Sequence, residues 1–166
     1  MTTSSKLRPQ PEPSATSSPC YEGDLYGWVQ HQVALLKAGK LSEIDAGNVA
    51  EELSDVGSEQ YDKLESAIRV VLLHLMKWDH QPTHRSKSWV FSIRTQRRHI
   101  VKVLKKNPSL RPHIPEAIGD AYHDARDEAQ QETGLPASVF ELTCPYDWDA
   151  IQSRAVEFED IRSPEE

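Results

Sequence analysis

Apolar residues recur at helical spacing through residues 45–78, the longest patterned stretch of the chain. They fall on one stripe of a helical wheel, which predicts an amphipathic helix about 50 Å long. Ser42 or Asp45 is placed to cap its start, and Gly57 marks the point where the helix would bend or split. No segment alternates with a period of two residues for long enough to form a strand, so the chain is predicted to be all-α. The stripe consists of Val49, Leu53, Val56, Leu64, Ala67, Val71, Leu75 and Trp78.

A shorter helix is predicted before it, over residues 21–38. Asp24 can cap its start and Gly39 can end it, because glycine readily adopts the left-handed conformation that closes many helices. Its apolar residues follow the spacing of an amphipathic helix, so they are expected to face inward. These residues are Leu25, Trp28, Val29, Val33 and Leu36.

Two long helices and one short helix are predicted after the central one. Gln81-Pro82 ends the central helix, since the residue before proline avoids helical geometry. The next helix runs from Ser86 or Ser88 to residue 106, with Trp89, Ile93, Gln96, Ile100, Val103 and Leu104 inward. A fourth helix starts at 110 or 112 and ends at Thr133-Gly134, and a short helix is expected within 147–155.

Size and composition favour a single helical domain, bundle-like with four main helices, over residues 21–156. A chain of 166 residues with 37% hydrophobic residues suits one core. Four prolines among serines and threonines predict that residues 1–20 are a disordered tail, and residues 157–166 form an acidic tail. The C-terminal segment before that tail is expected to pack over one end of the bundle. With neither an export signal nor a membrane-spanning stretch, the predicted location is the cytoplasm.

Charge is distributed unevenly along the chain, although the net charge is −7. Residues 80–115 contain no Asp or Glu and nine Lys or Arg, whereas 41–79 hold nine acids against three bases. Residues 116–166 hold fourteen acids against three bases. The middle of the sequence is therefore a basic island in an acidic protein. Its positive residues are Arg85, Lys87, Arg94, Arg97, Arg98, Lys102, Lys105, Lys106 and Arg111.

Several of these cations fall on one outer face of the helix predicted to end at 106. Arg94, Arg98, Lys102 and Lys105 lie within about 80° of one another, with Phe91 among them and Arg85 and Lys87 at the helix start. Cations displace phosphate counterions and an aromatic ring can stack on a base, so the face suits nucleic acid or an acidic protein. A second interpretation is a solvated face neutralised by the acidic helices beside it. The pI of about 5.5 argues against a dedicated nucleic-acid binder.

Signals for catalysis or metal binding are weak. His74 lies on the inward stripe, and with Glu52 and the histidines of loop 79–88 it suggests a metal-dependent or hydrolytic site as an alternative function. Yet neither Glu-x-x-His nor HExxH occurs, so a satisfied core histidine is the favoured interpretation. Ser86 and Ser88 stand in no nucleophile motif, and no phosphate-binding loop is present. No catalytic residue, metal ligand or cofactor is therefore assigned, and an enzyme is the less favoured prediction.

Aromatic residues in and around the loop 77–89 are predicted to be structural. Trp28, Trp78, Trp89 and Tyr122 occupy inward helix positions, where each polar hydrogen needs a partner. Arg85 is expected either to cap the end of the central helix or to stack on a neighbouring tryptophan. A structural role for this loop is thus at least as well supported as a functional one.

Three stretches of the chain resemble a known family. They are Leu75 to Trp89 with its Lys-Trp, Gln-Pro and Arg-Ser-x-Ser-Trp elements, the Ile-x-x-Gln-Arg-x-x-Ile run at Ile93 to Ile100, and the Thr-Gly-Leu-Pro and Cys-Pro-Tyr elements near the end. On these residues the chain resembles the bacterial family called domain of unknown function 29, over roughly 21–151. The resemblance implies a compact helical domain of bacterial origin and no established reaction, cofactor or catalytic residue. The function predicted is a non-enzymatic binding module that uses the basic helix 86–106.

Overall fold

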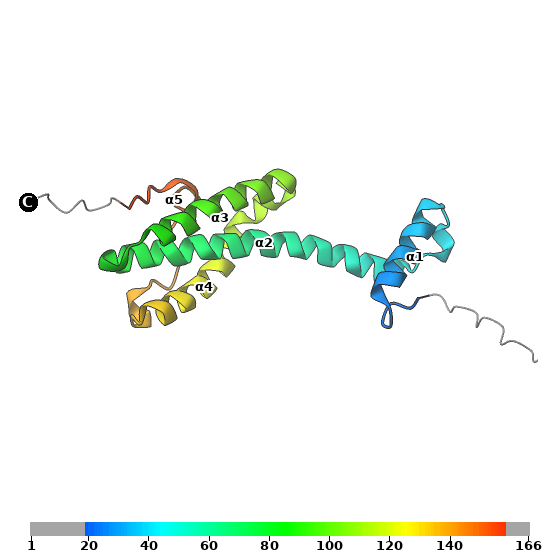
Figure 1. Cartoon of the computed structure of the whole chain (residues 1–166), viewed down its shortest axis with the longest axis horizontal. Coiled ribbons are helices and arrows are strands. Elements are labelled where there is room, and N and C mark those ends of the chain that lie inside the picture. The colour runs from blue at the N-terminus through cyan, green and yellow to red at the C-terminus, as the bar shows by residue number, and fades with distance from the viewer. Residues whose placement is uncertain (1–18, 159–166) are drawn as a thin grey trace, which may run out of the picture. The chain divides into compact units, whose positions relative to one another are not determined.

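A computed structural model describes residues 19–158 of the chain, and these residues are all-α, as predicted. The N-terminal tail prediction lies outside the described residues for positions 1–18, and the acidic-tail prediction does so for positions 159–166. Short 3-10 turns connect the α-helices (Figure 1). The helices are α1 (Leu25–Lys37), α2 (Ala46–His80), α3 (Lys87–Lys106), α4 (Ile114–Thr133) and α5 (Trp148–Ser153).

Local capping signals determine where the helices begin and end. The Asp24 carboxylate accepts a hydrogen bond from the Gly27 amide at 2.9 Å and caps α1. Ser86 caps α3, and Gly134 ends α4 in the left-handed conformation with φ 68°. These boundaries confirm the sequence prediction. The start of α4 differs, because residues 108–113 form a 3-10 turn that delays the helix to Ile114.

The central helix α2 is continuous from Ala46 to His80, and Gly57 does not split it. Asp45 rather than Ser42 caps it, since the Asp45 carboxylate accepts from the Asn48 amide at 3.3 Å and from the Asn48 side chain at 2.7 Å. A single glycine inside a helix costs only about 1 kcal/mol, which the surrounding turns tolerate.

The described residues divide into two compact units, 19–54 and 55–158. In the first unit, Trp28 is buried and the Tyr21 ring meets it edge to face at 4.9 Å. The Tyr21 hydroxyl donates to Glu52 at 2.8 Å, and the Gln32 side-chain oxygen accepts from the Asp45 amide at 2.9 Å. The buried Gln32 side chain therefore bridges the turn between α1 and α2, and Tyr21 links Trp28 of α1 to Glu52 of α2.

The inward face of α1 differs from the predicted one. Trp28 and Leu35 are buried with Gln32, whereas Leu25 and Leu36 are about half exposed. An apolar pattern cannot reveal that Gln32 is inside, because its burial depends on the hydrogen bond from Asp45. On α2, Leu53 and Val56 are likewise exposed, so the inward prediction is wrong for them.

The core of the second unit is formed by α2, α3, α4 and the C-terminal segment, with α3 and α4 alongside the second part of α2 in Figure 1. Leu72 and Met76 are fully buried, so both belong to this core. The buried side of α4 is largely alanine, which lets its backbone approach its neighbours closely. These alanines are Ala117, Ala121, Ala125 and Ala129.

The C-terminal segment packs against this core, as expected. Phe140, Ile151 and Val156 are buried. The Tyr146 hydroxyl and the Arg154 guanidinium both donate to the Asp79 carboxylate at the end of α2, each to Oδ2 at 2.8 Å. Burial raises the pKa of Asp79, but the hydrogen bonds from Arg154 and Tyr146 outweigh it and hold the pKa below its ordinary value. These polar contacts join the end of α2 to the segments on both sides of α5.

Candidate functional site

Arg85, a predicted partner-binding residue, is part of the structure of the loop. Its Nε donates to the carbonyl oxygen of Trp78 at 2.9 Å, and its guanidinium carbon lies 4.7 Å from the centre of the Trp78 ring. Both predicted structural roles of Arg85 are thus confirmed, because it caps the last turn of α2 and stacks on a tryptophan. These contacts hold the Arg85 guanidinium against the end of α2.

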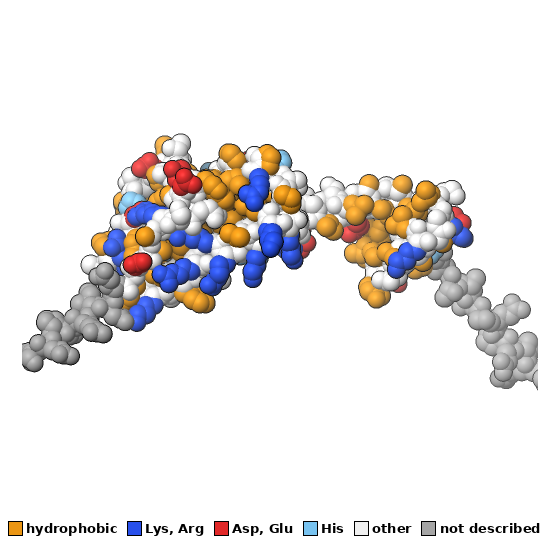
Figure 2. Space-filling model, turned by 90° about the horizontal axis from the view of Figure 1, so that it is seen from above, with side chains coloured by type: hydrophobic (Ala, Val, Ile, Leu, Met, Phe, Trp, Pro, Cys, Tyr) orange, Lys and Arg blue, Asp and Glu red, His pale blue; other side chains and the backbone are white. Residues whose placement is uncertain are grey.

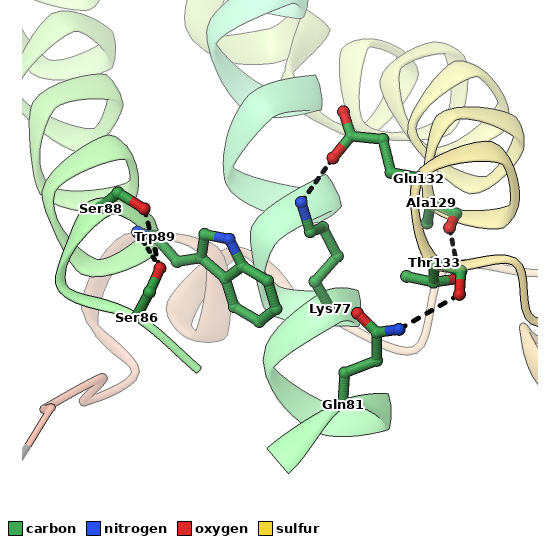
Figure 3. Close-up of polar contacts among 8 residues, drawn as sticks. All are labelled: Lys77, Gln81, Ser86, Ser88, Trp89, Ala129, Glu132 and Thr133. Carbon is green, nitrogen blue, oxygen red and sulfur yellow. Dashed lines mark hydrogen bonds and ion pairs between the residues drawn. The ribbon is translucent and has the colours of Figure 1, made fainter. Parts of the chain in front are cut away.

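Lys77 and Gln81 join the end of α2 to the end of α4 (Figure 3). Lys77 is only 8% exposed, forms an ion pair with Glu132, and places its ammonium 4.7 Å from the centre of the Trp89 ring. The Gln81 side-chain nitrogen donates to the Thr133 carbonyl at 3.2 Å. The polar residues around the loop 77–89 are thereby used in holding three helices together.

The two serines at the start of α3 bond to each other rather than to a base. Their hydroxyl oxygens are 2.8 Å apart, and the Ser86 oxygen also accepts from the Trp89 amide at 3.4 Å (Figure 3). Within residues 19–158, neither serine has a histidine or carboxylate as a hydrogen-bond partner. Ser86 is a helix cap, and among the described residues neither serine is paired with a base that would activate it as a nucleophile.

His74 lies near Lys77, and its ring stacks on Trp89 with ring centres 6.3 Å apart. Burial, aided by the nearby Lys77 charge, lowers the pKa of His74 to about 4. The ring is therefore neutral at pH 7. Its Nδ1 has no hydrogen-bond partner among the described residues, so the prediction of a fully satisfied core histidine is wrong for that nitrogen.

The residues of the alternative metal or hydrolytic site do not assemble. Glu52 accepts from Tyr21 in the first unit, and His74 stacks on Trp89 in the second unit. Among the described residues, no three His, Cys, Asp or Glu side chains are grouped so as to hold a metal ion. The alternative site therefore has no geometric support.

The outer face of α3 presents a row of exposed cations. Arg94, Arg98, Lys102 and Lys105 recur at spacings of four, four and three residues, which places them on one side of the helix over roughly 16 Å. Phe91 precedes them by one turn and is 67% exposed. Lys87, at the first position of α3, is exposed as well. Lys and Arg side chains line the larger body of the molecule in Figure 2.

The row formed by Arg94, Arg98, Lys102 and Lys105 makes no ion pair within the described part of the chain. Among residues 19–158, no carboxylate lies within ion-pair distance of Arg94, Lys102 or Lys105. Arg98 donates only to the Thr95 hydroxyl, at 3.2 Å. Carboxylates of α4 pair instead with bases of α2, as in Arg69 with Glu128. The row is therefore solvated, as one interpretation of the sequence held, and among the described residues no ion pair neutralises it.

Arg97 has a role that sequence reasoning missed. It points away from the exposed row, and its guanidinium donates to the carbonyl oxygens of Ile151 at 2.7 Å, Arg154 at 2.8 Å and Ala150 at 2.9 Å. It therefore caps the C-terminal end of α5 and attaches the C-terminal segment to α3. The sequence offers no signal of this role, because the acceptors are backbone carbonyls more than fifty residues further along the chain.

Two open cavities flank the row. One, about 460 Å³, is at the N-terminal end of α3 and is lined by Lys87, Val90, Phe91, Arg94, Glu157 and Phe158. The other, about 630 Å³, is near the C-terminal end and includes Lys63, His99, Lys102 and Lys106. Of the sequence-predicted binding residues, the cavities include Lys87, Phe91, Arg94, Lys102 and Lys105. Arg98 lies on the exposed row between them, and Arg85 belongs to the loop.

Taken together, the described residues define an all-α protein with an exposed basic helix, and within residues 19–158 no group of His, Cys, Asp or Glu side chains is arranged to hold a metal ion. No helix in that range combines the length and apolar character needed to cross a membrane. Residues 20–155 match the family model described as Domain of unknown function DUF29, so the chain belongs to that family, as its resemblance suggested. Neither a curated protein nor a solved structure matches the chain.

Proposed function

We propose that this protein is a non-enzymatic binding module whose α3 face binds an anionic macromolecule. The observation that supports the proposal is the row formed by Arg94, Arg98, Lys102 and Lys105, exposed and without a carboxylate partner among the described residues. Exposed cations without a charged partner add little to the stability of the fold, since surface charges contribute at most about 1 kcal/mol even when paired. Their arrangement is suited to an external anion.

The net charge of −7 does not prevent such binding. Charges separated by more than about 8–10 Å are largely screened at physiological ionic strength, so a partner senses the local row more than the whole molecule. Several acids in the second unit are also engaged with bases, as Glu128, Glu132 and Asp79 are. Repulsion from the remaining acids lowers affinity and makes binding more dependent on close contact with α3.

Single-stranded nucleic acid is the partner class that the face favours over an acidic protein. Phe91 is an exposed aromatic ring at the head of the row, and bases stack on such rings regardless of sequence. A row about 16 Å long along one helix also follows an extended polyanion. The proposal places the protein in the bacterial cytoplasm, where nucleic acid is present and where the free thiols of Cys20 and Cys144 are maintained.

The test is a fluorescence-anisotropy titration of labelled single-stranded RNA and DNA at about 50 and 200 mM salt. Four phosphate contacts predict that binding weakens by roughly 50-fold over that range. The variant Arg94→Glu with Arg98→Glu should lose binding, whereas the matched reversal Lys37→Glu with Lys40→Glu, on exposed residues of the first unit, should retain it. The two variants carry the same net charge, so the comparison separates the α3 face from total charge.

Absence of binding at both salt concentrations, or equal loss in the two double variants, would refute the nucleic-acid proposal. A parallel titration with poly-L-glutamate tests the acidic-protein class on the same face. Binding of that polymer alone, lost only in the α3 variant, would assign the face to an acidic protein instead.

A further inference from the structure

The cavity of about 460 Å³ at the N-terminal end of α3 combines aromatic rings with positive charge. Phe91 is 67% exposed and Phe158 is 39% exposed, so each presents a ring surface to solvent at the cavity. Val90 contributes a buried apolar residue, and Arg94 brings the first cation of the exposed row. A volume of this size lies in the range of small-molecule sites.

The cavity exists because the C-terminal segment is fixed beside α3. Val156 is 4% exposed within the core, and Arg97 of α3 donates to the carbonyl oxygens of Ile151 and Arg154. These two attachments hold the chain immediately before Glu157 and Phe158. Two segments far apart in sequence thus place Phe158 at the same cavity as Phe91.

Exposed aromatic rings offer flat surfaces on which a planar group can stack. A nucleobase is such a group, and its phosphate can reach the cation beside it. Glu157 also lines the cavity, and its carboxylate repels phosphate. The same carboxylate can accept a hydrogen bond from an exocyclic amine, as carboxylates do from cytosine. The lining therefore combines ring surfaces, a phosphate contact and one acceptor.

We propose that this cavity binds one unstacked base of a single strand that lies along α3. The base stacks on Phe91 and Phe158, its neighbouring phosphate contacts Arg94, and Glu157 favours a base that carries an exocyclic amine. This inference rests on the proposed nucleic-acid function and adds a position at which the strand is recognised by its base rather than by its charge alone.

The experiment compares an oligodeoxycytidine strand with an abasic strand of the same length, which keeps the phosphates and lacks the bases. Wild-type protein should bind the cytidine strand about tenfold more tightly than the abasic strand, given the usual contribution of one base stacked on an aromatic ring. Phe91→Ala should remove most of that difference and leave affinity for the abasic strand unchanged. Phe158→Ala should reduce the difference as well, because its ring lines the same cavity.

Leu142→Ala is the matched control, since Leu142 is 86% exposed and does not line the cavity. It should bind both strands as wild type does. Equal, salt-sensitive binding of the two strands by wild type would overturn the base pocket and leave the proposed function standing. Binding of neither strand would overturn both. A Phe91→Ala variant that keeps the full preference for cytidine would exclude Phe91 from base recognition and overturn the pocket.

Discussion

The basic segment 80–115 supplies two groups of arginines that the structure uses in opposite ways. Arg85 and Arg97 lie against backbone carbonyls at the ends of α2 and α5, whereas Arg94 and Arg98 stand exposed on α3. Neither inner arginine needs a carboxylate, because the C-terminal end of a helix carries partial negative charge and unsatisfied carbonyls. Arginines of a segment without acidic residues can therefore be stabilised in the fold by carbonyl oxygens at helix ends. The other arginines of the segment remain exposed and available to a partner.

The largest expected effect separates the neighbours Arg97 and Arg98. Arg97→Ala removes three charge-assisted hydrogen bonds to the C-terminal segment and should lower the free energy of unfolding by about 3 kcal/mol. Arg98→Ala should change it by less than about 0.5 kcal/mol. Urea denaturation monitored by tryptophan fluorescence measures both. Equal stability of the two variants would contradict the division of the basic segment into structural and exposed arginines.

His74, which stacks on Trp89 near the Lys77 charge, provides the next effect. Its pKa is about 4 in the folded protein against an ordinary 6.5, so between these values the unfolded chain binds a proton that the folded chain does not. Stability should therefore fall as the pH drops from about 6.5 to 4. The expected loss is about 2 kcal/mol, less than the full pKa difference implies, because part of the ring remains accessible to solvent.

His74→Phe should keep the stacking on Trp89 and lose this pH dependence. The measurement is urea denaturation of both proteins at about pH 7 and pH 4.5. The variant should be less sensitive to acidification than wild type over that interval. Parallel loss of stability in the two proteins would show that other groups, such as the Asp79 carboxylate, cause the acid sensitivity.

Much of the fold could be predicted because helix boundaries depend on local residues. Asp24, Ser86 and Gly134 mark helix ends in the sequence and do so in the structure. The faces of the helices were harder to predict, since burial is a tertiary property. Gln32 is inside α1 only because the amide of Asp45, beyond the turn, donates to it. A hydrophobic pattern contains no such information.

The candidate site divides in the same way. The exposed row on α3 follows from helical spacing and charge, so Arg94, Arg98, Lys102 and Lys105 could be grouped from sequence. The cavity could not, because Phe158 reaches it from a segment more than sixty residues away from Phe91. The role of Arg97 was hidden for the same reason, as its acceptors are carbonyls of a distant helix end.

A smaller effect sharpens the distinction between charge and shape at Arg85. Arg85→Lys keeps the positive charge but loses the Nε hydrogen bond to Trp78 and the planar stacking on its ring. Stability should fall by about 1 kcal/mol, while the salt dependence of nucleic-acid binding should not change. Thermal denaturation and anisotropy on the same preparation test the two statements. A change in the salt dependence would move Arg85 into the binding face.

The smallest effect on stability, and the most direct check on the exposed group, comes from Lys102→Gln. This residue lies on the exposed row and has no ion-pair partner in the described chain. Its substitution should therefore change the free energy of unfolding by less than about 0.5 kcal/mol. If Lys102 contacts one phosphate, the slope of log affinity against log salt should decrease in magnitude by about 0.7 for a single strand. Lys37→Gln, which removes an exposed charge from the first unit, should leave that slope unchanged. A smaller slope in both variants would mean that total charge governs the interaction. A smaller slope in Lys102→Gln alone would show that Lys102 itself contacts a phosphate of the strand.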